Sequence, residues 1–143
     1  MFDVAAFTLP QQLTSKENIQ PDSPFHQELK NFMNESDLLC SEINTNGQFY
    51  RNGDLLVIEV EDSDTIKVGV IQTVLVRNDS VYFVTKSYLC KRHWLRYFES
   101  VDCDNVCIFT ESKRIVDYKP LIKRGTSVKF NFMLHHHISF TYD

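Results

Sequence analysis

The chain has 143 residues, a formal net charge of −4, four glycines and four prolines, and 43% of its residues are apolar. A chain of this length fits one domain that buries roughly two-thirds of its unfolded surface, so no disulfide or metal is needed to hold it together. Because it contains no run of about eighteen apolar residues and no secretory signal, we expect a cytoplasmic or nuclear protein without a membrane span. Its four cysteines are then expected to be reduced.

The charges are unevenly distributed along the chain. Residues 1–85 hold five Lys and Arg against thirteen Asp and Glu, whereas residues 86–143 hold ten against six. The basic half is a candidate for contact with an anionic partner. The alternative is that these charges are only the solvated surface of strands and loops.

The N-terminal part is predicted to be an arm followed by a helix. Residues 1–22 have no hydrophobic period and are expected to be extended or disordered, and residues 23–143 are expected to form a single β-rich domain. The helix should span about residues 24–34, with Ser23 as its cap and Pro24 in its first position. We expect its apolar face to pack on the sheet, although a partner could bind there instead. That face consists of Phe25, Leu29, Phe32 and Met33.

Short β-branched and aromatic runs between polar breaks predict strands along most of the chain. Asn46-Gly47 predicts a type I′ hairpin turn, and Gly69 predicts a bulge or sharp bend within its strand. Ser87 to Ser100 has no clear period and is expected to be a helical turn or a long loop that leads into a strand at Arg96–Val101. The other predicted strands are Leu38–Ile43, Leu55–Val60, Ile66–Val76, Val81–Thr85, Val106–Thr110, Lys113–Val116 and Thr126–Ile138.

Eight or nine short strands with one helix indicate an all-β class with minor α content, in the form of a barrel or sandwich. The run from Phe49 to Ile58, followed by Lys67 to Val74, resembles the opening of SH3-like barrels of the bromo-adjacent-homology and Tudor chromatin-reader families. In those families a tyrosine and a Gly-Asp pair enter the first strand, and a glycine lies in the second. The resemblance implies an SH3-like or related small β-barrel that reads histone tails or nucleic acids.

A second resemblance covers Glu42 to Ile138. The order of features is similar to that in the C-terminal domain of uncharacterised proteins associated with transposable elements in fish and invertebrates. This resemblance implies a nucleic-acid or chromatin context without an assigned activity. The matching marks are Asn46-Gly47, Phe49-Tyr50, Val81 to Val84, Asp117-Tyr118, Pro120-Leu121 and His135 to Ile138.

Basic residues with interleaved aromatic residues are the main candidates for a binding site. Lysine and arginine neutralise phosphates, and exposed aromatic faces can stack on bases. The alternative is that the rings belong to the core. The candidate nucleic-acid-binding residues are Lys91, Arg92, Trp94, Arg96, Tyr97, Lys113, Arg114, Lys119, Lys123 and Arg124.

Two further kinds of site are considered. An aromatic cage for methyl-lysine requires three or four rings around one cation, and Tyr50, Tyr82, Tyr88 and Trp94 are its candidates. Structural zinc requires four sulfur or nitrogen ligands, and Cys90, His93, Cys103 and Cys107 have ligand-like spacing. Buried cysteines and packed tyrosines are the competing interpretations.

The remaining polar clusters carry weaker signals. His135 and His137 would share one face of a strand and bind a metal or phosphate, or simply lie on a solvated edge. The acidic residues Glu59, Glu61, Asp62 and Asp64 would form a solvated hairpin tip, or hold a divalent ion for a nuclease. No Ser or Cys has a neighbouring His with an orienting carboxylate, so nucleophilic catalysis has no support.

We therefore predict a binding module without catalytic activity or cofactor, whose partner is DNA, RNA or a histone tail. The first alternative is a protein–protein interaction module that forms a homodimer through the N-terminal arm, the helix or a strand edge. A metal-dependent enzyme is a third class, and metal analysis would test it.

Overall fold

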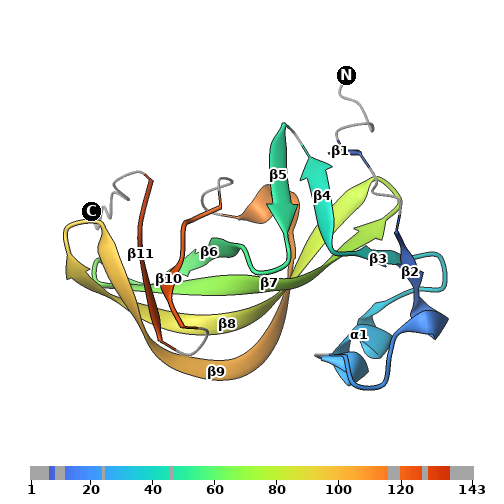
Figure 1. The fold of residues 1–143 in the computed structure, drawn as a ribbon, viewed down its shortest axis with the longest axis horizontal. Helices are drawn as coiled ribbons and strands as arrows, with labels where there is room; N and C mark the ends of the chain where they lie inside the picture. The colour runs from blue at the N-terminus through green and yellow to red at the C-terminus, as the bar shows by residue number, and fades with distance from the viewer. Residues whose placement is uncertain are drawn as a thin grey trace.

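A computed structural model of the protein describes residues 7–8, 12–23, 25–45, 47–115, 120–126 and 129–135. Its main sheet has eight strands and is strongly curled into a half-barrel (Figure 1). The strands lie in the order β10-β11-β9-β8-β7-β3-β2, and β6 also pairs with β7. Their bounds are β2 Thr14–Ser15, β3 Leu38–Cys40, β6 Leu55–Val60, β7 Thr65–Arg77, β8 Ser80–Trp94, β9 Tyr97–Glu111, β10 Arg124–Gly125 and β11 Phe130–Met133. The predicted all-β, barrel-like fold with one flanking helix is confirmed.

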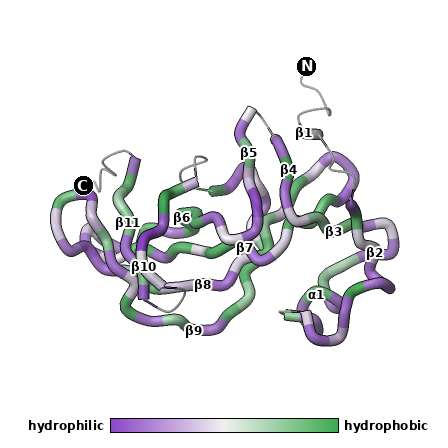
Figure 2. The backbone as a smooth tube through the Cα atoms, in the orientation of Figure 1, coloured by the Kyte–Doolittle hydropathy of each residue, from purple (hydrophilic) through white to green (hydrophobic). Residues whose placement is uncertain are grey.

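The antiparallel strands β7, β8 and β9 form the centre of the sheet, and hydrophobic and hydrophilic residues follow one another along them (Figure 2). The expectation of a loop or helical turn over Ser87–Ser100 is wrong, because β8 continues to Trp94 and β9 begins at Tyr97. The two-residue turn between them holds Leu95 at φ 49 and contains no glycine, so the usual hairpin signal is missing. Bulges on both strands also interrupt the period of two.

The chain after β9 departs from the prediction in two places. Residues Ser112–Arg114 form a 3-10 helix, so the predicted strand over Lys113–Val116 is wrong. Among the described residues the last strand is also shorter than Thr126–Ile138, because Thr126 and Lys129 close a turn through their backbone and hydroxyl groups. The expected alternation holds within β11, where Phe130 and Phe132 are buried.

The segment before β10 joins the two ends of the curled sheet. The Leu121 amide donates to the carbonyl of Leu55, the first residue of β6, at 2.9 Å. Buried side chains pack in the interior behind this bridge and form the first core cluster. This first core cluster contains Leu55, Val57, Ile66, Val68, Val70, Tyr88, Cys90, Phe98, Leu121, Phe130, Phe132 and Leu134.

Of the two features predicted at Gly69, a bulge or a sharp bend, the bulge is not found there. Its pairing with Leu56 and Ser87 is regular, and the register shifts lie at Ile58 and Gln72 instead. The glycine serves close packing: a Cβ at position 69 would lie 2.4 Å from Ile58 Cδ1 and 2.6 Å from Thr85 Cβ.

The predicted strand Leu38–Ile43 is divided at Ser41, because the chain leaves the main sheet there. The strand β4, Glu42–Thr45, pairs with β5, Gln48–Arg51, and with β1, Phe7–Thr8. A two-residue turn joins β4 to β5 as expected, with Gly47 at φ 78, while Asn46 lies outside the described residues. A second core cluster, which includes Tyr50 and Phe83, packs beneath this hairpin.

The helix α1, His26–Phe32, is shorter than the predicted span 24–34. Phe25 at φ 57 is its N-cap, and Ser23 contributes its backbone carbonyl to the His26 amide rather than a side-chain cap. The expectation about Pro24 lies outside the described residues. None of the described helices has the length and apolar character that a bilayer span requires.

The apolar face of α1 packs on the sheet, as expected. Leu29 and Met33 are buried in a third core cluster with Leu75 and Val84. The Phe32 ring stacks on Phe109 of β9 at a centroid distance of 4.1 Å. The helix is therefore held mainly by burial of apolar area, which contributes about 25 cal/mol per Å².

Candidate functional site

The end of the β8–β9 hairpin carries a row of apolar and aromatic side chains across three strands. Trp94 pairs with Tyr97, and Tyr97 pairs with Met133 of β11. Directly paired residues of an antiparallel sheet have side chains on the same face, so these three residues are neighbours. Trp94 is 68% exposed and Met133 is 54% exposed, and Leu95 beside them is 62% exposed.

A second, more polar row lies next to the first. Lys91 pairs with Glu99, Glu99 with Asn131, and Asn131 with Arg124 of β10. Lys91 and Arg124 are exposed cations, and Glu99 is the carboxylate between them. Together with Arg96 in the turn, the two rows form what we call the hairpin-end surface: Lys91, Trp94, Arg96, Tyr97, Glu99, Arg124, Asn131 and Met133.

A hollow of about 350 Å³ lies within this surface. The Arg96 guanidinium donates from Nη1 to the His135 carbonyl at 3.0 Å, and the Leu134 amide donates to the Arg96 carbonyl at 2.9 Å. These bonds hold the chain after β11 against the hairpin turn. The hollow is lined by Arg96, Tyr97, Ile122, Arg124, Asn131, Phe132, Met133, Leu134 and His135.

The two histidines near this surface make different contacts. His135 places Nε2 2.7 Å from the Pro120 carbonyl, and because a carbonyl only accepts, this nitrogen must carry the hydrogen. His93 lies 3.8 Å from the Glu99 carboxylate and edge-on to the Tyr97 ring. The expectation that His135 and His137 share one face depends on His137, which lies outside the described residues.

Arg92 belongs to the predicted set but is committed to structural contacts. Its Nε and Nη2 donate to the Ser63 carbonyl at 2.8 and 2.6 Å, and Nη1 donates to the Leu95 carbonyl. Its guanidinium also lies 3.4 Å from the Asp64 carboxylate and 5.0 Å from the Phe98 ring centroid. Arg92 therefore fastens the β6–β7 loop to the hairpin turn and is not part of the hairpin-end surface.

The remaining predicted basic residues are divided between two places. Lys113 and Arg114 follow the far end of β9 and lie 3.5 and 3.8 Å from the Glu111 carboxylate. Lys123 lies beside β10, with Nζ 5.4 Å from the Phe130 ring centroid. Lys119 lies outside the described residues. The structure thus brings together Lys91, Trp94, Arg96, Tyr97 and Arg124, and separates Lys113 and Arg114 from them.

The predicted aromatic cage does not assemble, because three of its rings pack in three different core clusters. Tyr50 is buried against Phe83, and Tyr88 is buried against Phe130. Tyr82 packs beside Phe32 on the helix side. Trp94 alone is exposed, so the four rings cannot surround one cation.

The four candidate zinc ligands do not come together in one site. Cys90 is fully buried in the first core cluster, and burial raises its pKa to about 12. Cys107 packs on the helix side, and burial there raises its pKa to about 12. Cys103 packs at the first core cluster and His93 is exposed. Within the described ranges, no three His, Cys, Asp or Glu side chains form a group able to hold a metal ion.

The acidic residues of the β6–β7 loop are used locally. Asp62 accepts the backbone amide of Asp64 at 2.8 Å, and Asp64 faces Arg92. Glu61 lies 4.0 Å from Lys67, and Glu59 is exposed. These contacts match the solvated hairpin tip rather than a divalent-ion site.

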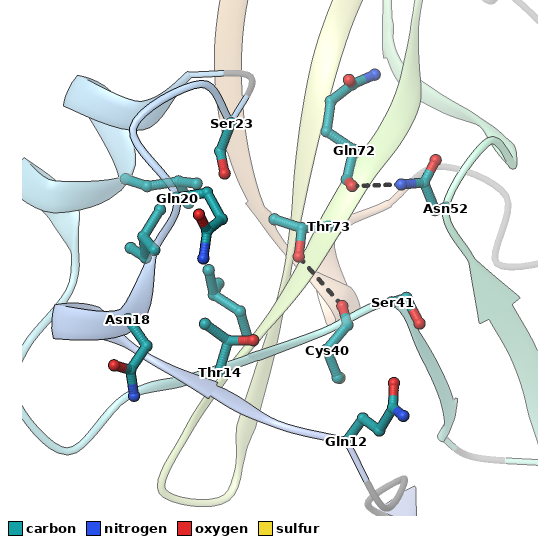
Figure 3. Close-up of a pocket in the computed structure, with 13 residues that line it drawn as sticks. Gln12, Thr14, Asn18, Gln20, Ser23, Cys40, Ser41, Asn52, Gln72 and Thr73 are labelled. Atoms are coloured by element: carbon teal, nitrogen blue, oxygen red, sulfur yellow. Dashed lines mark hydrogen bonds between the residues drawn. The ribbon is translucent and has the colours of Figure 1, made fainter.

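A separate cavity of about 340 Å³, which is not used in the proposals below, lies between the residues before α1 and the bulge of β7 (Figure 3). Asn52 donates to the Gln72 carbonyl at 2.8 Å, and Thr73 donates to the Cys40 carbonyl at 3.1 Å. None of the described residues that line this cavity has a charged side chain, so they offer no attraction to a polyanion. It is lined by Gln12, Thr14, Asn18, Ile19, Gln20, Ser23, Leu29, Leu39, Cys40, Ser41, Asn52, Gln72 and Thr73.

Sequence reasoning missed Leu95, Ile122 and Met133, the exposed apolar residues near the hairpin-end surface. A recognised hairpin turn at residues 95–96 would have indicated Leu95, whereas no local pattern indicates Ile122 or Met133. No family model, curated protein or solved structure matches the chain. The two family resemblances stay predictions.

Proposed function

We propose that the protein is a non-catalytic nucleic-acid-binding module and that the hairpin-end surface is its contact surface. The observation that carries this proposal is the 68% exposure of Trp94 beside Tyr97, with the cations Lys91, Arg96 and Arg124 around them. Tryptophan is highly buried on average, so an exposed one at a strand end suggests a ligand. Stacking of a base on an aromatic ring is worth about 1–3 kcal/mol.

The charge of the surface supports the same partner. The hairpin-end surface holds the three cations Lys91, Arg96 and Arg124 against the single carboxylate of Glu99, and His93 lies 3.8 Å from that carboxylate. Phosphate groups next to a stacked base would contact Arg96 and Arg124, whose side chains line the same hollow. Glu99 opposes this attraction, so Glu99→Gln should strengthen binding.

Protein–protein interaction is the second candidate. A protein–protein interface would also account for the exposed apolar residues, because aromatic and methionine side chains are enriched at interfaces. These residues are Trp94, Leu95, Ile122 and Met133. The apolar face of α1 supports it less, since Leu29 and Met33 are already buried. Light scattering separates the candidates, because a dimer that Trp94→Ala dissociates would favour self-association.

Neutralising two arginines should weaken nucleic-acid binding and reduce its salt dependence. Fluorescence anisotropy with labelled oligonucleotides between about 50 and about 200 mM salt measures both. Each lost phosphate contact on a single strand removes about 0.7 from the slope of log K against log salt, so Arg96→Gln with Arg124→Gln should remove about 1.4.

The matched control is Lys113→Gln with Arg114→Gln, which removes the same charge at the far end of β9. It should leave the affinity within about twofold of the unaltered protein. Equal losses for the two pairs, or no salt-dependent binding by the unaltered protein, would contradict the proposal. Thermal melting of each variant checks that its fold is intact.

A further inference from the structure

A second hollow, of about 480 Å³, lies beside the hairpin-end surface. It is formed between β5 and the segment that leads into β10. Ile122, which is 68% exposed, lines this hollow and also the first one. The two hollows share Ile122 in their linings, and we refer to them together as the groove. The second is lined by Gln48, Phe49, Arg51, Gly53, Asp54, Pro120, Leu121, Ile122 and Lys123.

The second hollow repeats the chemistry of the first. Phe49 is 39% exposed, and the guanidinium carbon of Arg51 lies 5.6 Å from its ring centroid. Lys123 adds a second cation to the lining. Among the described residues that line this hollow, the only carboxylate is that of Asp54, which accepts the Arg51 backbone amide at 3.0 Å. An aromatic ring and an arginine thus line both hollows, Tyr97 with Arg96 in the first and Phe49 with Arg51 in the second, and Lys123 and Arg124 are adjacent in the chain between them.

We infer that the ligand is a single-stranded nucleic acid that contacts Trp94 and follows this groove from the neighbouring Tyr97 across Ile122 to Phe49. This inference rests on the proposed function and extends it to the state of the strand and the length of the site. Bases in a duplex are stacked on each other and cannot lie on protein rings, whereas a single strand can present them one at a time.

The length of the ligand follows from the spacing of the strands. Neighbouring strands lie about 4.8 Å apart, so β10 is about 14 Å from β8 along the sheet, and the second hollow lies beyond β10. A tetranucleotide can occupy the first hollow, whereas an oligonucleotide of about twelve residues can reach both, within the range of known single-strand sites.

The test compares Arg51→Gln with unaltered protein on tetramer and dodecamer deoxythymidine oligonucleotides, by anisotropy and calorimetry. The arginine is exposed, so its replacement should not disturb the fold. We expect about tenfold weaker binding of the dodecamer and unchanged binding of the tetramer. Phe49→Leu is a second variant with the same expected pattern, and Arg114→Gln is the matched control with no expected effect.

The outcomes separate the inference from the proposed function. If the unaltered protein binds oligonucleotides but neither Arg51→Gln nor Phe49→Leu affects the dodecamer, the extended groove is wrong while the proposed function stands. Binding of duplex and single strand with equal affinity would also overturn the inference. If no oligonucleotide binds the unaltered protein, the proposed function itself fails, and the inference fails with it.

Discussion

Replacement of Asp37 by alanine should destabilise the protein by about 3–5 kcal/mol, because it leaves half of a buried ion pair. The Asp37 side chain is fully buried, and Arg77 donates to its carboxylate from Nε and Nη2 at 2.9 and 2.6 Å. The same guanidinium donates to the Phe32 carbonyl at the end of α1 at 2.8 Å. This one arginine therefore ties the helix and the segment before β3 to the end of β7.

The same pair predicts a dependence of stability on pH. Burial alone would raise the pKa of the Asp37 carboxyl, but the hydrogen bonds from Arg77 and the Asn34 amide outweigh burial and lower the pKa below 3.8. A carboxyl with a lowered folded-state pKa contributes stability above its unfolded pKa and loses it as the pH falls through the folded value. The free energy of unfolding should therefore fall less between neutral pH and about pH 3 in Asp37→Asn than in the unaltered protein.

Urea denaturation at neutral pH and at about pH 3 measures both effects. Glu35→Ala is the control, because Glu35 is two residues away, is 87% exposed in its side chain and makes only a 3.8 Å contact with Lys16. It should change stability by less than about 0.5 kcal/mol. Equal effects of Asp37→Ala and Glu35→Ala would show that the buried pair does not stabilise the fold.

Replacement of Gly69 by valine is the second change with a large expected effect. A Cβ there would lie 2.6 Å from both Cβ and Oγ1 of Thr85, which is itself 1% exposed. Thr85 Oγ1 donates to the Ile108 carbonyl of β9 at 3.2 Å, so moving it disturbs the β8–β9 pairing. Overpacking of this kind costs about 1–3 kcal/mol, and the branched side chain of valine should reach the upper end.

Gly69→Ala should already show part of this loss in urea or thermal denaturation. Gly47→Asn is the control, because nothing lies within 4 Å of a Cβ at position 47 and asparagine tolerates its φ of 78. A Gly69→Val protein as stable as Gly47→Asn would contradict the close packing between β6, β7 and β8.

Much of the fold could be predicted from local patterns. The strands β6 and β7 are β-branched runs bounded by polar turns, and Asn78-Asp79 lies at the turn where β8 was expected to begin. The β8–β9 hairpin could not be predicted in the same way. Its turn contains Leu95 in a left-handed conformation, which few sequences signal, and bulges shift the faces of both strands.

The same bulges limited the prediction of the site. Consecutive residues of a strand point to opposite faces, so the basic run after Cys90 had to be divided between two sides. Arg92 turns to the Ser63 carbonyl and the core, while the register shift at His93 places Trp94 beside Tyr97. Sequence spacing alone showed neither outcome. It also could not show that Ile122, far from Trp94 in the chain, lines the same groove.

Trp94 is the only tryptophan of the chain, so its fluorescence reports on the proposed contact surface alone. Titration with a single-stranded deoxythymidine oligonucleotide at low salt, with emission and anisotropy recorded together, therefore tests the central claim most directly. The account predicts saturable quenching of the emission that added salt reverses and that Arg96→Gln with Arg124→Gln weakens. An emission that stays unchanged through the titration would contradict it.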